Sequence, residues 1–214
     1  MWGSRAPSIS TLTEDAALTL PLAVSLAVVL VTATLLWLRN RQLSKLRPRG
    51  GCAPVRVTPS GRLHLLLIRS RKHPEVFTFP AGAVERGETY AQAAARETLE
   101  EAGVTGRLGR RLCEVRDEKT RTSLFALHVE EERATWQEAH ERERIWFDMG
   151  VPGSPASKEA VARVRETLST KPTTQRLFEK VHAQSQALAQ ECESFERKWA
   201  RSKTKSAQPT RAAG

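Results

Sequence analysis

The residues best suited to chemistry in this chain lie close together, between Gly82 and Val104. Glutamates occupy positions 85, 88, 97, 100 and 101 of this stretch. Carboxylate oxygens are the hard ligands that Mg²⁺ prefers, and Mg²⁺ usually keeps several waters that leave room for substrate phosphates. So dense a group of carboxylates therefore indicates a place where a divalent cation meets a polyphosphate.

The second half of the stretch predicts a helix with one acidic face. At about 100° per residue, Glu97, Glu100 and Glu101 fall on the same side of that helix. The predicted opposite face is small and largely apolar, suited to lie against a sheet, and consists of Ala91, Ala95, Thr98, Leu99 and Ala102. Gly103 is expected to end the helix as a left-handed cap. Charge alone allows two explanations, a metal site or a solvated acidic face paired with Arg96.

The spacing of the glycines, glutamates and Arg96 resembles a known motif. Gly82 is followed by five residues and Glu88, then by seven residues and the run Arg96-Glu97-Thr98-Leu99-Glu100-Glu101-Ala102-Gly103-Val104. This resembles the Nudix box, G-x5-E-x7-R-E-U-x-E-E-x-G-U with U an aliphatic residue, and only Thr98 is less apolar than usual. The full spacing favours the metal site over the solvated face. The resemblance implies an α/β fold, a Nudix-type α/β/α sandwich with a mixed sheet.

The same resemblance implies a Mg²⁺-dependent hydrolase of phosphoanhydride bonds, with Mn²⁺ as a substitute. The implied metal ligands are Glu97, Glu101 and the Gly82 carbonyl. Glu100 is the implied general base, and Glu88 and Arg96 are the implied supporting residues. The chemistry is consistent, because a cation polarises the phosphoryl oxygen while a carboxylate orients and deprotonates the attacking water. The division of roles among the three helix glutamates stays open, because it varies between family members.

The segments around the box narrow the resemblance. Residues 71–75, 77–82, 100–112, 119–122 and 142–147 look like the corresponding segments of diphosphoinositol polyphosphate phosphohydrolases. Members of that group act on inositol pyrophosphates and diadenosine polyphosphates, so the resemblance implies a highly anionic small-molecule substrate. The residues expected to contact its phosphates are Ser70, Lys72, Lys119, Arg121, Arg142 and Lys171. Ala81 and Ala83 stand where that group usually has glycines, which leaves the substrate open.

Other functions remain compatible with these residues. One is a Nudix pyrophosphatase for nucleoside diphosphate derivatives, such as ADP-ribose or damaged nucleoside triphosphates, or for RNA caps. Another, from a different class, is a membrane-tethered module that binds RNA or polyphosphate, whose affinity would fall steeply with salt. Apart from capped RNA, no nucleic-acid partner is expected, and no oligomer is predicted.

Length and charge bound the organisation of the chain. Its 214 residues allow one ordinary domain with extensions, and a net charge of +10 favours an anionic partner. The three cysteines are odd in number and lack a C-x-x-C pair. They therefore indicate neither a disulfide framework nor a zinc site, and a reducing compartment is the simpler interpretation.

Residues 16–38 carry no charge. As a helix, a run of this length is long enough to cross a hydrocarbon core of about 30 Å. The basic residues that follow are Arg39, Arg41, Lys45, Arg47 and Arg49, against Arg5 alone before the run. The positive-inside rule then predicts a single-pass membrane protein that contacts lipid through 16–38 and has its domain in the cytosol. The organelle stays open.

The predicted organisation has six parts. They are a short N-terminal segment (1–15), a transmembrane helix (16–38), a basic linker (39–51), a Nudix hydrolase domain (52–180), a C-terminal helix extension (181–199) and a disordered basic tail (200–214). Strands are expected at 55–57, 63–68, 106–115, 122–130 and 144–147, and helices at 157–169 and 173–199, in addition to the box helix.

Overall fold

The computed structural model describes residues 24–39, 41 and 46–206. The chain separates into two units, Met1–Leu46 and Arg47–Gly214.

The first unit contains a helix over residues 24–39, whose large apolar side chains are exposed. Within the described ranges, no helix combines the length and apolar character needed to cross a membrane. The transmembrane helix predicted over 16–38, and the membrane location and lipid contact inferred from it, are therefore not supported. Residues 16–23 of that prediction lie outside the described residues.

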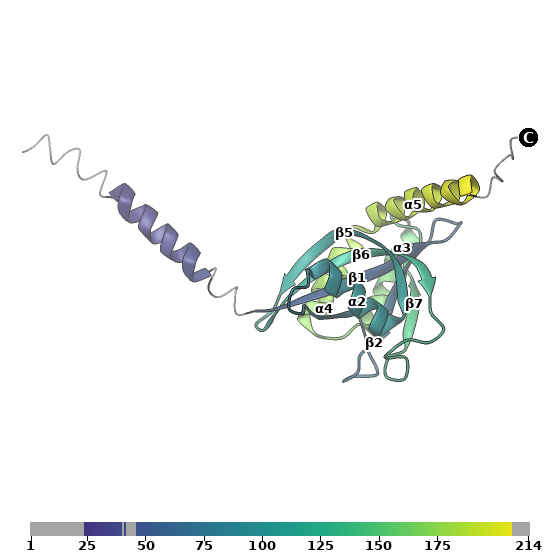
Figure 1. Ribbon diagram of the computed structural model, residues 1–214, viewed down its shortest axis with the longest axis horizontal. Helices are drawn as coiled ribbons and strands as arrows, with labels where there is room; N and C mark the ends of the chain where they lie inside the picture. Colours follow the sequence, from purple (N-terminus) through teal and green to yellow (C-terminus); the bar gives the residue numbers. More distant parts are fainter. Residues whose placement is uncertain (1–23, 40, 42–45, 207–214) are drawn as a thin grey trace, which may run out of the picture. The chain divides into compact units, whose positions relative to one another are not determined.

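The described part of the second unit is built on a seven-stranded mixed sheet (Figure 1). Its strands are β1 (Arg47–Val57), β2 (Leu63–Arg69), β3 (Phe77–Thr78), β4 (Ala81–Ala83), β5 (Val104–Arg116), β6 (Thr120–Glu132) and β7 (Arg144–Asp148). The order is β3-β2-β1-β6-β5, with β4 paired to β1 and β7 paired to β2. The pair β1–β6 is parallel and the remaining pairs are antiparallel. The five strands predicted from sequence are confirmed in β1, β2, β5, β6 and β7.

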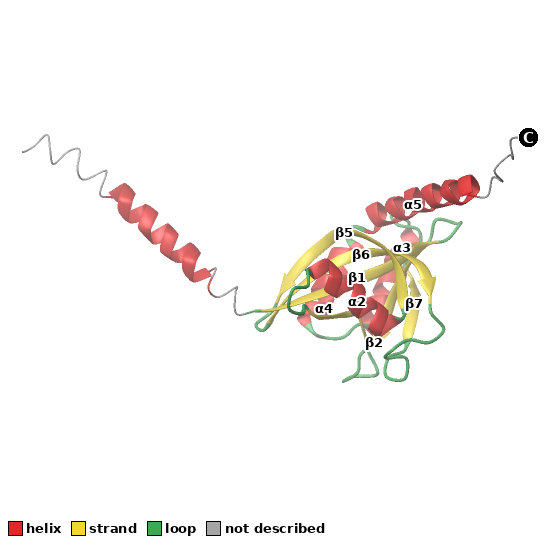
Figure 2. Cartoon of the chain, in the orientation of Figure 1, coloured by secondary structure: helices red, strands yellow, loops and turns green. Residues whose placement is uncertain are grey.

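Helices cover both faces of this sheet (Figure 2). They are α2 (Tyr90–Ala102), α3 (Pro155–Thr167), α4 (Pro172–His182) and α5 (Ser185–Ser206). Strand β2 reveals the two layers, because Leu65 and Leu67 pack with residues of α3, α4 and α5 while Leu66 and Ile68 pack with α2. Successive side chains of a strand point to opposite faces. The predicted α/β class and mixed sheet are therefore confirmed.

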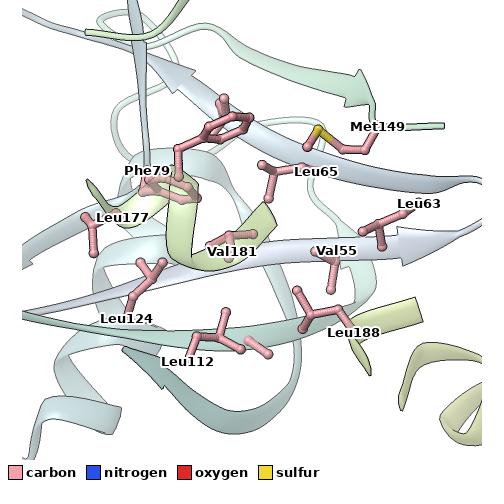
Figure 3. Close-up of a cluster of buried hydrophobic side chains, with 14 of the residues drawn as sticks. Val55, Leu63, Leu65, Phe79, Leu112, Leu124, Met149, Leu177, Val181 and Leu188 are labelled. Carbon is pink, nitrogen blue, oxygen red and sulfur yellow. The ribbon is translucent and has the colours of Figure 1, made fainter. Parts of the chain in front are cut away.

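The larger core lies between the sheet and the three C-terminal helices (Figure 3). Leu124 of β6, Leu177 of α4 and Leu188 of α5 meet there and are at most 4% exposed. Burying such side chains stabilises the domain by roughly 1.5–3 kcal/mol each relative to exposure. This core supports the face of the sheet opposite to α2.

Strand β1 begins earlier than the sequence predicts, since residues 47–51 belong to it and not to a linker. Gly50 faces α2, where an added Cβ would lie 2.3 Å from the Tyr90 carbonyl oxygen. Gly51 faces β4, where an added Cβ would lie 2.5 Å from the Ala81 Cβ. The two glycines therefore permit close contacts of β1 with a helix and with a neighbouring strand. A Gly-Gly pair is also common in flexible linkers, so the sequence alone does not distinguish the two uses. Gly51 also makes room for the Ala81 methyl group.

The box helix has well-defined ends. Thr89 and Gln92 form a capping box at its start, and Gly103 ends it with φ 63°, which confirms the predicted cap. The buried residues are Ala93, Ala94, Thr98, Glu101 and Ala102. The predicted buried face is confirmed at Thr98 and Ala102 but is wrong at Ala95, which is exposed, and it left out Glu101, which is buried. Thr98 is tolerated at an aliphatic position because its hydroxyl donates to the Ala94 carbonyl at 2.7 Å.

The helix predicted over 173–199 is divided into α4 and α5. Ala183 ends α4, and the Gln184 side chain donates to the carbonyl of Leu112 at 3.1 Å. The apolar residues continue at helical spacing across the break, so periodicity alone does not reveal it. Helix α5 extends to Ser206, so residues 200–206 of the predicted disordered tail are helical, and residues 207–214 lie outside the described residues.

Candidate active site

Strand β4 and the second half of α2 bring the box glycine against a box glutamate. Gly82 lies in β4, paired with Gly50 of β1. An added Cβ at Gly82 would lie 1.9 Å from the carboxyl carbon of Glu97. The Glu97 carboxylate therefore packs directly on the Gly82 backbone, and only glycine leaves room for it.

Arg96 holds the exposed side of the box together. Its guanidinium donates to Glu88 at 3.0 Å, to Glu97 at 2.8 Å and to Glu100 at 3.2 Å. It also donates to the Ala83 carbonyl at 2.9 Å. The hydrogen bond from Arg96, followed by one from the Glu85 backbone N–H, lowers the pKa of Glu88. Arg96 therefore links three of the box glutamates to one another through one guanidinium.

Glu101 is the most buried carboxylate of the group, 6% exposed. One of its oxygens accepts from the Ala81 backbone N–H at 2.8 Å, and the other lies 2.6 Å from the guanidinium of Arg142. Burial raises the pKa of Glu101 to about 7, while Arg142 opposes this and the charge of Glu97 adds to it. Glu97 precedes Glu101 by four residues, so the two carboxylates lie on the same side of α2.

The connection between β6 and β7, residues 133–143, attaches to the end of α2. The Trp136 indole N–H donates to the Glu101 carbonyl at 3.1 Å, and the Glu138 backbone N–H donates to the Glu100 carbonyl at 3.1 Å. The Trp136 ring also covers Gly103, where an added Cβ would lie 2.7 Å from it. Sequence reasoning did not identify Trp136 or Glu138 as site residues. The sequence signal that could have indicated Glu138 is its spacing of four residues from Arg142, which suits an ion pair.

Sequence comparison agrees with this geometry. A family model described as NUDIX domain matches residues 47–167, which is more than half of the chain. The chain belongs to the Nudix family. The match begins at Arg47, where β1 begins, so the domain starts before the predicted residue 52.

The relatives found among curated proteins include two kinds of Nudix protein. The chain is 42% identical to Diphosphoinositol polyphosphate phosphohydrolase 2 of Rattus norvegicus over 87 residues, which are 39% of this chain and 49% of the relative. It is 36% identical to Nudix hydrolase 18, mitochondrial, of Arabidopsis thaliana over 109 residues, 45% of this chain and 61% of the relative. It is 40% identical to Diphosphoinositol polyphosphate phosphohydrolase 3-alpha of Mus musculus over 88 residues, 39% of this chain and 54% of the relative. The chain spans about half the length of the curated relatives it matches.

Nudix proteins typically use a divalent metal, and the residues here fit one by donor type. Glu97 and Glu101 offer carboxylate oxygens beside a glycine that lacks a Cβ, and hard oxygen donors suit Mg²⁺. In the described part of the chain, no three His, Cys, Asp or Glu side chains converge as a ready-made metal site. The box carboxylates are instead paired with Arg96 and Arg142, which supply the positive charge.

Three of the predicted substrate-binding residues lie near the start of β6. Lys119 is the last residue of the β5–β6 turn, Arg121 is the second residue of β6, and Lys171 precedes α4. Asp117 joins these segments, because it accepts from the Lys119 backbone N–H and from the Thr173 hydroxyl, each at 2.8 Å. Partial burial disfavours its charge, but these hydrogen bonds and those of Thr120 outweigh burial and lower the pKa of Asp117 to about 2.

The parallel pairing of β1 with β6 adds two basic residues to this group. Arg47 pairs with Thr120, and Arg49 pairs with Thr122. The Arg49 guanidinium donates to the Ala81 carbonyl, beside Gly82. Arg121 donates to the Tyr90 hydroxyl at 2.8 Å, at the first turn of α2. Sequence reasoning missed Arg47 and Arg49 as site residues because it placed both in a linker.

The other predicted substrate-binding residues lie elsewhere. Ser70 and Lys72 belong to the turn after β2, where the Ser70 N–H donates to the Val76 carbonyl at 2.9 Å and Lys72 is exposed. This turn approaches residues 133–143, since Arg71 lies 2.5 Å from Glu141. Arg142 is 13% exposed and bonds to carboxylates of the protein, so its guanidinium is engaged within the site.

Proposed function

We propose that this Nudix protein is a hydrolase of phosphoanhydride bonds that requires Mg²⁺, with Mn²⁺ as a substitute. The observation that carries the proposal is the placement of Glu97 against Gly82, with Glu101 anchored behind it by Ala81 and Arg142. A solvated acidic face has no need for a glycine under one carboxylate or for burial of another. Both features suit a site that collects oxygen ligands.

The roles proposed for the residues follow from their contacts. Glu97, Glu101 and the Gly82 carbonyl would hold the cation. When bound, the cation would polarise a phosphoryl oxygen and offset the charge that develops on it. Glu100 is less buried than Glu101, and it would take a proton from the attacking water. Arg96 bonds to Glu100 at 3.2 Å and would orient it for that step.

The proposed substrate is a diphosphoinositol polyphosphate or a diadenosine polyphosphate. Two considerations support this class, namely the names of the similar rat and mouse proteins and the basic group beside the box. That group consists of Arg47, Arg49, Lys119, Arg121 and Lys171. Clustered cations raise the local concentration of a polyanion and bind phosphate oxygens by charge-assisted hydrogen bonds. Ser70 and Lys72 would contact the substrate from the turn after β2.

The test is an assay of the full chain with Mg²⁺ on four substrates, namely an inositol pyrophosphate, diadenosine hexaphosphate, ADP-ribose and capped RNA. The first two should be cleaved fastest. The variant Glu100→Gln should lose about 10²- to 10⁴-fold in kcat, the usual contribution of a general base. Glu159→Gln is the matched control, since Glu159 is exposed and pairs with Arg163 of its own helix, outside the box.

The outcomes separate the alternatives. Preferential cleavage of ADP-ribose or capped RNA would replace the proposed substrate class but keep the hydrolase. No cleavage of any substrate, together with salt-sensitive binding of RNA or polyphosphate, would support a binding module instead. An unimpaired Glu100→Gln variant would refute the role given to Glu100.

A further inference from the structure

The end of the box helix is closed by residues from outside the box. The last carbonyls of a helix have no partners within it. Here the carbonyls of Glu100, Glu101, Ala102 and Gly103 accept hydrogen bonds from Glu138, Trp136, Arg144 and Arg133, at distances between 2.8 and 3.2 Å. Each donor lies in the β6–β7 connection or at the first residue of β7. This connection therefore determines where the helix end, with its two glutamates, is held.

Arg142 extends this attachment to a side chain. Its guanidinium lies 2.6 Å from an oxygen of Glu101 and 2.5 Å from an oxygen of Glu138, so it bridges the two carboxylates. The Arg142 backbone N–H also donates to the Glu138 carbonyl at 2.9 Å, which fixes the origin of the side chain. Since Ala81 holds the second oxygen of Glu101, both oxygens of this carboxylate are oriented by segments outside the helix.

We propose that Arg142 is a positioning residue that sets the orientation of the Glu101 carboxylate for the divalent cation. This inference rests on the proposed function, because it assumes that Glu101 is a cation ligand. The contact with substrate phosphate that the resemblance implies for Arg142 stays a separate prediction. The Arg142 guanidinium is 13% exposed and contacts the two carboxylates through Nε and one Nη nitrogen, at 2.5 and 2.6 Å, so its place beside Glu101 is fixed from two sides. The β6–β7 connection thus contributes to cation affinity without supplying a ligand.

The test measures Mn²⁺ binding to the full chain by isothermal titration calorimetry, with no substrate present. The variant Arg142→Ala should bind Mn²⁺ about tenfold more weakly, the effect of losing one charge-assisted hydrogen bond. Arg142 lines an open cavity of about 500 Å³, together with Arg69, Trp136 and Arg144. Guanidinium added at millimolar concentration can therefore reach the vacated position, and it should restore Mn²⁺ affinity. Urea, which has similar shape but no charge, should not.

Two further variants separate the possible outcomes. Arg69→Ala is the matched control, because Arg69 lines the same cavity but pairs with Glu143, and its Mn²⁺ affinity should equal that of the wild type. Glu101→Gln should lose Mn²⁺ affinity; if it does not, the cation site of the proposed function is wrong. If Glu101→Gln loses affinity but Arg142→Ala keeps it, or binds more tightly, only the role of Arg142 is refuted.

A loss in Arg142→Ala that guanidinium does not restore would mean that the residue is merely structural, which also refutes the proposal. Thermal melting in the presence of EDTA checks that each variant is folded. If Arg142→Ala does not fold, Glu138→Gln takes its place, since this substitution removes one of the two carboxylates that hold Arg142. Glu138→Gln should then weaken Mn²⁺ binding by about threefold, a smaller effect than loss of the guanidinium. Unchanged affinity in that variant would overturn the inference.

Discussion

The contact between Gly82 and Glu97 makes Gly82→Ala the most informative single substitution. The added Cβ would lie 1.9 Å from the carboxyl carbon of Glu97, whereas an ordinary contact begins at 3.4 Å. The carboxylate must therefore move by about 1.5 Å, or β4 must move by the same amount. A misplacement of about 1 Å at a reacting centre can reduce the rate by about 10²-fold. We expect kcat to fall by about that factor.

The same clash should lower stability only moderately. Adding a methyl group to a packed site costs about 2 kcal/mol. In a domain of this size that corresponds to a fall in Tm of about 4–8 °C, so the variant should remain folded at 25 °C. Initial rates on the best-cleaved substrate and the Kd of Mn²⁺ measured by calorimetry, which requires no substrate, are the two readouts.

Gly109→Ala is the control for the change from glycine to alanine. Its added Cβ would lie 3.1 Å from the Nε2 atom of His128 and 3.2 Å from the Cβ of Ala126, which is a milder contact outside the box. Gly109→Ala should keep the wild-type kcat and Mn²⁺ affinity. Wild-type kcat and Mn²⁺ affinity in Gly82→Ala would refute the reasoning, because Glu97 would then not need its observed place.

Three further predictions concern the box carboxylates and the strand beneath them. The pKa of Glu101 is raised from 4.5 to about 7, so the stability linked to its protonation is present at low pH and is lost as pH rises from 4.5 through about 7. In EDTA, the Tm of the wild type should fall across this pH range and that of Glu101→Gln should fall less, and equal slopes would contradict the assignment. Arg96→Met should lower the free energy of unfolding in EDTA by about 2 kcal/mol. Mg²⁺ should raise the Tm of this variant more than that of the wild type, since the cation replaces the lost charge, and an equal rise would argue against a cation at these carboxylates. Gly50→Ala places a Cβ 2.3 Å from the Tyr90 carbonyl oxygen, so it should lower the free energy of unfolding, measured by urea titration, by about 3 kcal/mol. An unchanged free energy of unfolding would mean that α2 can move away from β1 at little cost.

Several parts of the fold could be predicted because their signals are local. The box helix and its Gly103 cap follow from spacing and from the preference of glycine for positive φ. The alternation in Leu124, Ala126 and His128 marks β6 as a strand. The start of β1 could not be predicted in this way, because a Gly-Gly pair in a strand and one in a linker look the same until a helix is packed on it.

The candidate site divides in the same manner. The sequence by itself determined which carboxylates could take part, since Glu88, Glu97, Glu100 and Glu101 fall within one motif whose spacing matches a helix. Only the tertiary structure decided their environments, namely Glu101 buried against Ala81 and Arg142, and Glu97 lying on Gly82. It also placed the guanidinium of Arg142, which is distant in the sequence, 2.6 Å from an oxygen of Glu101. The physical reason is that a carboxylate's protonation and orientation depend on the charges and hydrogen-bond donors within a few ångströms, and those neighbours come from strands and loops that only folding brings together.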